Sequence, residues 1–132
     1  MKIKSSQELV EEARKYIKTI KANDVKNLVG SEECSLIDLR DIREIWKEGT
    51  IQNSIHIPRG MLEFWLDPKS KYFKKEKFNH DKKMILFCAL GLRSALANKT
   101  LMDMGFKNVF DVEGGFAALK ESGLEVIQKE KK

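Results

Sequence analysis

Cys88 and Arg93 are the residues of this chain whose types and spacing are best suited to chemistry. Cys88 ends a short apolar run, residues 84–87, and Arg93 follows five positions later, before a helical pattern over residues 94–104. An apolar run of this length with glycine close behind is typical of a strand buried on both faces of a parallel sheet. A thiol where such a strand meets a helix lies beneath free backbone N–H groups and the positive end of the helix dipole. The pattern therefore predicts a nucleophilic thiolate in an anion cradle.

The alternative interpretation of Cys88 is a core cysteine that happens to end a strand, because free cysteines are often buried. Two features of the following loop favour the functional interpretation. The loop is short, so Arg93 can turn toward the sulfur, and Gly91 permits a positive φ that points successive N–H groups inward. Cys34 precedes a strand without such a loop, so we predict a structural role for it.

Four segments of the chain resemble, in order, the signatures of single-domain rhodaneses. They are residues 36–41, an apolar strand ending in Asp-x-Arg; residues 49–58, a partial match; the loop 88–94; and the closing segment 105–116. The resemblance extends over about residues 18–127. It implies a sulfurtransferase that carries sulfane sulfur as a Cys88 persulfide, by double displacement between a donor and an acceptor thiol or cyanide. Thiosulfate, a polysulfide or a persulfide is the expected donor, and no cofactor is required.

The resemblance also assigns roles around Cys88. The backbone N–H groups of the loop would cradle the terminal sulfur; the residues concerned are Ala89, Leu90, Gly91, Leu92, Arg93 and Ser94. Asp38 and Arg40 are expected to support the loop through buried hydrogen bonds and an ion pair. Arg59 and Trp65 follow the third strand at the same sheet edge and are candidates for the pocket wall, although Trp65 could equally cover the core.

The chain departs from the family pattern at several positions. Thr50, Gln52 and Asn53 stand where His, Pro and Gly are usual, and we interpret them as turn residues; Leu119 replaces a frequent Trp as a core residue. The loop carries apolar side chains where thiosulfate-using members often have polar ones, which leaves the donor open. Whether a small thiol or a protein accepts the sulfur is also open.

Two other functions remain as alternatives. Phosphatases and arsenate reductases also place a cysteine in an anion cradle, but their arginine follows at the sixth position, where this chain has Ser94. Non-catalytic binding modules of the same fold usually lack the loop cysteine, which is present here. Sulfur transfer is therefore the favoured function.

Composition is typical of one small soluble domain. The 132 residues are 42% hydrophobic, enough for a single core. We expect an N-terminal helical extension over residues 1–17, the rhodanese-like domain over 18–127 and a charged tail over 128–132. No signal peptide or membrane span is evident, so we expect a cytoplasmic protein with free thiols and no membrane partner. The cysteines and histidines lack metal-site spacing, so no metal is predicted.

The formal net charge of +5 suggests a nucleic-acid partner at first. The lysines of residues 69–83 and of the C-terminus are interrupted by acids, however, and lack regular aromatic residues between them. We interpret them as a solvated surface and predict no nucleic-acid partner.

The alternation of strand and helix patterns predicts an α/β fold, a five-stranded mainly parallel sheet with helices on both faces. Strands are predicted at residues 18–21, 36–39, 54–57, 84–87 and 108–112, and helices at 7–16, 23–29, 42–48, 94–104 and 116–122. Asn23 is the predicted N-cap of the second helix, and Asp41 with Glu44 form a predicted capping box at the start of the third. Ligands bind such sheets at the carboxyl ends of the strands, where Cys88 and Asp38 would meet. His56 lies within a predicted strand and is interpreted as structural.

Overall fold

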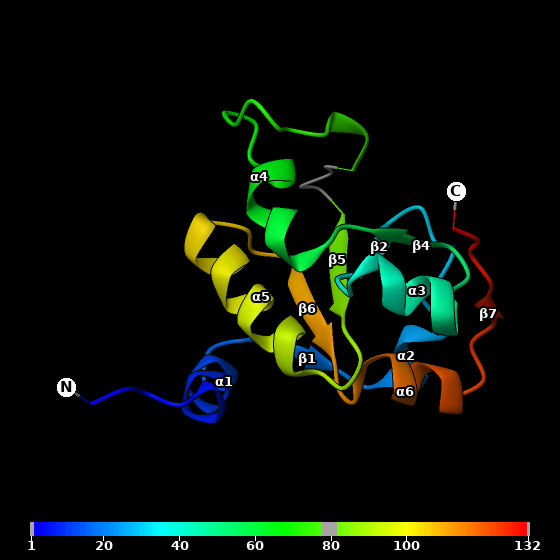
Figure 1. The fold of residues 1–132 in the computed structure, drawn as a ribbon, viewed down its shortest axis with the longest axis horizontal. Coiled ribbons are helices and arrows are strands. Elements are labelled where there is room, and N and C mark those ends of the chain that lie inside the picture. The colour runs from blue at the N-terminus through cyan, green and yellow to red at the C-terminus, as the bar shows by residue number, and fades with distance from the viewer. Residues whose placement is uncertain (1, 78–81, 132) are drawn as a thin grey trace.

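A five-stranded parallel sheet forms the centre of the computed structural model, which describes residues 2–77 and 82–131 (Figure 1). The strand order is β1-β6-β5-β2-β4, and each neighbouring pair is parallel. The strands are β1 (Thr19–Ile20), β2 (Cys34–Asp38), β4 (Ser54–His56), β5 (Lys83–Phe87) and β6 (Val109–Val112). The predicted α/β fold is therefore confirmed.

Alternate residues of β5 enter two separate cores, which explains why the whole strand is apolar. Ile85 and Phe87 pack with α2 (Ala22–Val25) and α6 (Gly115–Glu121). Met84 and Leu86 pack with α4 (Leu62–Leu66) and α5 (Leu92–Met104) on the other face. The sheet is thus covered by helices on both sides, and β5 lies at its centre with its carboxyl end directed at the start of α5.

Helix α3 (Ile42–Glu48) begins and ends where the sequence predicts. Asp41 caps it by accepting a hydrogen bond from Arg43 N at 2.8 Å, and Glu44 Oε2 accepts from Asp41 N at 2.9 Å. Both halves of the capping box are present, and Gly49 with φ +80° ends the helix.

Several elements differ from the prediction. Helix α2 begins at Ala22 after Lys21 instead of being capped by Asn23, because Ala22 and Val25 turn inward to the core. Helix α5 begins at Leu92, two residues early, because Gly91 ends the loop. Strands β3 (Thr50–Ile51) and β7 (Val126–Ile127) form an antiparallel pair that two-residue segments give no pattern to predict. Two short 3-10 helices complete the described elements, η1 (Arg59–Met61) and η2 (Lys75–Lys77).

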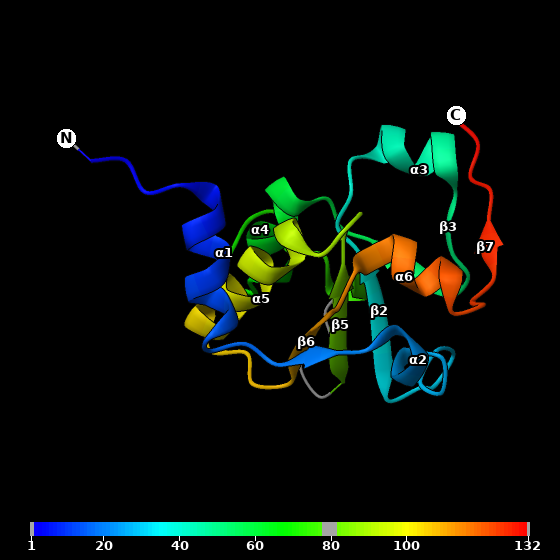
Figure 2. The ribbon, with the colours of Figure 1, turned by 90° about the horizontal axis from the view of Figure 1, so that it is seen from below.

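The N-terminal helix α1 (Ser6–Arg14) packs against α5 on the outside of the molecule, as Figures 1 and 2 both show. Ser5 caps it by accepting a hydrogen bond from Glu8 N at 3.1 Å. Val10 and Ala13 are buried in the contact. Among the described residues, no helix is long and apolar enough to cross a membrane.

Candidate active site

Cys88 lies immediately beyond β5, at the carboxyl edge of the sheet, and only 1% of it is exposed. Its Sγ accepts hydrogen bonds from Gly91 N at 3.2 Å and from Ser94 N at 3.3 Å. The thiol also lies 3.5 Å from Ser94 Oγ, to which it donates. Two backbone N–H groups at the start of a 13-residue helix therefore point at the sulfur, an arrangement that stabilises negative charge on it.

The loop that brings these donors together is shorter than predicted. Gly91 has φ +103° and is the residue from which α5 starts, so Leu92 and Arg93 already belong to the first turn. A positive φ at this position is readily available only to glycine. Leu90 and Leu92 point outward, 66% and 57% exposed, and form an apolar rim close to the sulfur.

The start of α6 holds the loop from the other side. Phe116 N donates to Cys88 O at 2.7 Å, and Ala117 N donates to Ala89 O at 3.3 Å. Gly115, with φ +59°, makes this approach possible, because a Cβ there would lie 2.8 Å from Ala89 O. The pair of glycines at 114 and 115 was matched to the family pattern, but its contact with the cysteine loop could not be read from the sequence.

Asp38 and Arg40 form a fully buried ion pair at the end of β2. Arg40 Nη2 donates to Asp38 Oδ2 at 2.8 Å, and Arg40 Nε donates to Oδ1 at 3.0 Å. Arg40 Nη2 also donates to Gly49 O at 2.7 Å, while Thr50 Oγ1 donates to Asp38 Oδ2 at 2.7 Å. Thr50, interpreted from the sequence as a turn residue, thus satisfies a buried carboxylate, a requirement that only the folded structure reveals.

Arg40 connects this ion pair to the cysteine loop through Phe116. The guanidinium carbon lies 4.0 Å from the centre of the Phe116 ring, a cation–π contact. Because Phe116 N donates to Cys88 O, Asp38 and Arg40 are connected to the loop through Phe116. Their role in supporting the loop stays a prediction.

The side chain of Arg93, predicted to turn toward the sulfur, forms its hydrogen bonds with Glu44. Its guanidinium makes a two-pronged contact with Glu44, with Nη1 to Oε2 at 2.8 Å and Nη2 to Oε1 at 3.0 Å. The pKa of Arg93 is raised chiefly by this contact and, to a lesser extent, by the charge of Cys88. The pKa of Glu44 is lowered, chiefly by its hydrogen bond with the Arg93 side chain. Sequence reasoning had recognised Glu44 only as a capping residue.

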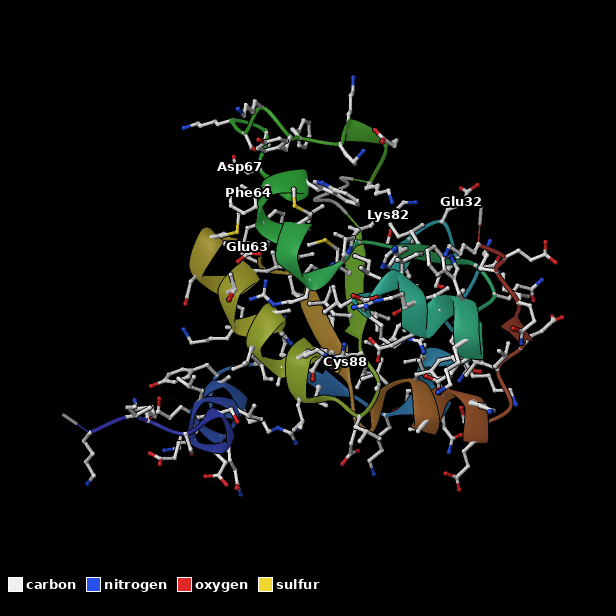
Figure 3. The ribbon with its side chains drawn as sticks, in the orientation of Figure 1. Glu32, Glu63, Phe64, Asp67, Lys82 and Cys88 are labelled. Atoms are coloured by element: carbon white, nitrogen blue, oxygen red, sulfur yellow. The ribbon has the colours of Figure 1, made fainter. Side chains whose placement is uncertain are left out.

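Arg59 and Trp65 have partners outside the cysteine loop. Arg59 Nη1 donates to Glu63 Oε1 at 2.8 Å, and Trp65 packs against the core on the α4 and α5 face. Lys74 and Lys77 lie over the Trp65 ring, 4.7 and 4.9 Å from its centre. Figure 3 shows neighbouring Glu63 and Phe64 well away from Cys88.

His56 contacts the backbone, and Cys34 lies at the start of a strand. His56 Nε2 is 2.7 Å from Arg40 O, and the ring is half-buried. Cys34 starts β2, and burial raises the pKa of its thiol. Both cysteines are free. Across residues 2–77 and 82–131, no three His, Cys, Asp or Glu side chains gather in a way that could hold a metal ion.

Two curated relatives match the sequence of this chain over only part of their own length. The chain is 32% identical over 96 residues to a tRNA uridine(34) hydroxylase of Hamiltonella defensa, a match that covers 73% of this chain and 26% of the relative. The same enzyme of Photorhabdus laumondii is 28% identical over 111 residues, covering 81% and 30%. The chain therefore spans less than a third of the length of these relatives.

Two solved structures match this chain over nearly the whole of their own length. A protein of unknown function from Rhodopseudomonas palustris, described as a possible tyrosine phosphatase, is 39% identical with a TM-score of 0.86, covering 96% of this chain and 97% of that chain. A rhodanese-related protein from Thermoplasma volcanium is 33% identical with a TM-score of 0.66, covering 85% and 99%. The family model of the rhodanese-like domain matches residues 21–122, most of the chain. With the cysteine loop at the carboxyl edge of its sheet, this protein belongs to the rhodanese-like domain family.

Proposed function

We propose that this protein is a sulfurtransferase that moves sulfane sulfur from a donor to a thiol or cyanide through a Cys88 persulfide. The observation that carries the proposal is the pair of backbone N–H groups, from Gly91 and Ser94, that point at Cys88 Sγ at 3.2 and 3.3 Å. They stabilise the thiolate before the reaction and are suited to hold negative charge on the added sulfur afterwards.

The reaction takes place in two displacements. With thiosulfate, the Cys88 thiolate attacks the outer sulfur, a new S–S bond forms, and sulfite leaves with the electron pair of the broken S–S bond. An acceptor thiolate or cyanide then attacks the terminal sulfur and releases the Cys88 thiolate. The burial of Cys88 suits a donor that presents a protruding terminal sulfur. The mechanism needs no cofactor and no nucleic-acid or membrane partner.

The spacing of the loop favours this function over phosphate ester hydrolysis, the activity suggested by the description of the Rhodopseudomonas palustris protein. Arg93 follows Cys88 at the fifth position, so the cradle is one residue shorter than a phosphatase loop. Arg93 is also engaged by Glu44 through both Nη atoms. The tRNA hydroxylation named for the curated relatives belongs to proteins of which the match covers less than a third, so the proposal rests on the loop.

Intact-mass spectrometry after incubation with thiosulfate, and separately with polysulfide, tests the proposal. We expect wild-type protein and Cys34→Ser to gain one sulfur atom that dithiothreitol removes, and Cys88→Ser to gain none, because a hydroxyl cannot hold sulfane sulfur. Thiocyanate formation with cyanide should follow the same order. Absence of sulfur gain in the wild type would favour a binding module, and turnover of an aryl phosphate would favour a phosphatase.

A further inference from the structure

Arg14 is distinguished from the other arginines by the absence of an ionic partner. The four others each form a salt bridge: Arg40 with Asp38, Arg43 with Asp41, Arg59 with Glu63 and Arg93 with Glu44. Within residues 2–77 and 82–131, no carboxylate lies within salt-bridge distance of Arg14, and its side chain donates no hydrogen bond. Its guanidinium is therefore available to an anion from solution.

The position of Arg14 places this charge beside the cysteine loop. A methyl group at Gly91 would lie 3.9 Å from Arg14 Nη2, and Gly91 N is one of the two donors to Cys88 Sγ. The charge of Arg14 acts on the carboxyl group of Asp111. Burial raises the pKa of Asp111, and the Arg14 charge offsets only part of this rise. Asp111 is 2% exposed and already accepts hydrogen bonds from neighbouring side chains, whereas Arg14 is exposed to solvent.

A groove of about 540 Å³ runs between α1 and the start of α5, and Arg14 is part of its wall. Its apolar lining comes from Val10, Leu92 and Leu96. This volume lies in the range of about 300–1,000 Å³ that is typical of sites for organic ligands. The carboxylate of the groove, Glu11, accepts a hydrogen bond from Gln7 Nε2 at 3.3 Å and disfavours a ligand with several negative charges.

We propose that this groove binds a low-molecular-weight organic persulfide, with Arg14 holding its carboxylate and the apolar wall holding its carbon skeleton. The inference rests on the proposed sulfurtransferase function and names its donor. The Cys88 thiolate bonds to the outer sulfur of R–S–SH, the S–S bond of the donor breaks, and R–S⁻ leaves with the electron pair. The proton stays on the transferred sulfur. Helix α1 thereby becomes part of the substrate site.

A matched pair of donors tests the role of the charge: the persulfide of N-acetylcysteine and that of its carboxamide. We expect Arg14→Gln to lower kcat/KM roughly tenfold or more for the acid, because a charge-assisted contact is lost, and to leave the amide unchanged. Arg14→Lys should restore part of the loss. The control is Lys15→Gln, which removes the same charge from an exposed neighbour and should alter neither donor.

Gln7→Trp tests the groove itself, because Gln7 is an exposed lining residue whose indole replacement would fill the space. We expect lower kcat/KM for both organic persulfides and unchanged turnover of thiosulfate. Equal effects of Arg14→Gln on acid and amide, or full activity of Gln7→Trp on both persulfides, would overturn the inference while sulfur transfer stands. Failure of the wild type to accept sulfur from any donor would instead refute the proposed function.

Discussion

Replacing Gly115 with alanine would test whether the start of α6 sets the position of the cysteine loop. Gly115 has φ +59°, and a Cβ there would lie 2.8 Å from both Ala89 C and Ala89 O, closer than Cβ atoms normally approach. The left-handed conformation costs alanine about 1–2 kcal/mol. The backbone must also shift, which weakens the hydrogen bonds from Phe116 N and Ala117 N, each with a net value of about 0.5–1.5 kcal/mol. We expect Gly115→Ala to destabilise the protein by about 2–5 kcal/mol.

Two other glycines serve as controls. Gly105 has φ +107° but open space around its Cβ position, so Gly105→Ala should cost only the conformational strain, about 1–2 kcal/mol. Gly60 has neither a positive φ nor a close neighbour, so Gly60→Ala should change stability by less than about 0.5 kcal/mol. Urea unfolding measures the stability of all three variants. Thiocyanate formation measures their rate of sulfur transfer, which depends on the position of the cysteine loop.

Only Gly115→Ala should also lower the rate of sulfur transfer under conditions where the protein stays folded, because it displaces the carbonyl groups of Cys88 and Ala89. If Gly115→Ala costs no more stability than Gly105→Ala and retains full activity, the contact between α6 and the loop does not hold Cys88 in place.

Asp38→Asn should lower the free energy of unfolding by about 3–5 kcal/mol, because it leaves the buried Arg40 charge without its partner; urea unfolding measures the loss. The folded-state pKa of Glu44 is lower than its ordinary value, so its contribution to stability is complete above that value and is lost as pH falls through the folded pKa. Between about pH 5 and pH 3, the stability of Glu44→Gln should therefore fall less steeply than that of the wild type; parallel curves would show that the contact with Arg93 adds nothing. Leu90→Arg, at an exposed loop position, should lower the KM for thiosulfate several-fold in steady-state kinetics, because it adds a charge-assisted contact; an unchanged KM would show that the apolar rim does not limit this donor.

Local patterns of the sequence determined the strand–loop–helix unit that carries Cys88. An apolar run, a cysteine, a glycine able to take φ +103° and a helical pattern lie within about twenty residues, so short-range preferences suffice. The same is true of the capping box of Asp41 and Glu44, which is formed within one helical turn. The parallel sheet followed from the alternation of strand and helix patterns, since such connections allow few topologies.

Only the tertiary structure decided which charges are neutralised and which remain available. Glu44 reaches Arg93 across 49 positions of the chain, and Arg40 meets the Phe116 ring on another helix. Helix α1 places Arg14 beside Gly91, far away in sequence. Such contacts depend on how the elements pack, and residue types and local periodicity carry no information on that packing. The sequence by itself therefore determined where Cys88, the proposed nucleophile, lies, and the packing of α1, α3 and α6 decided what surrounds it.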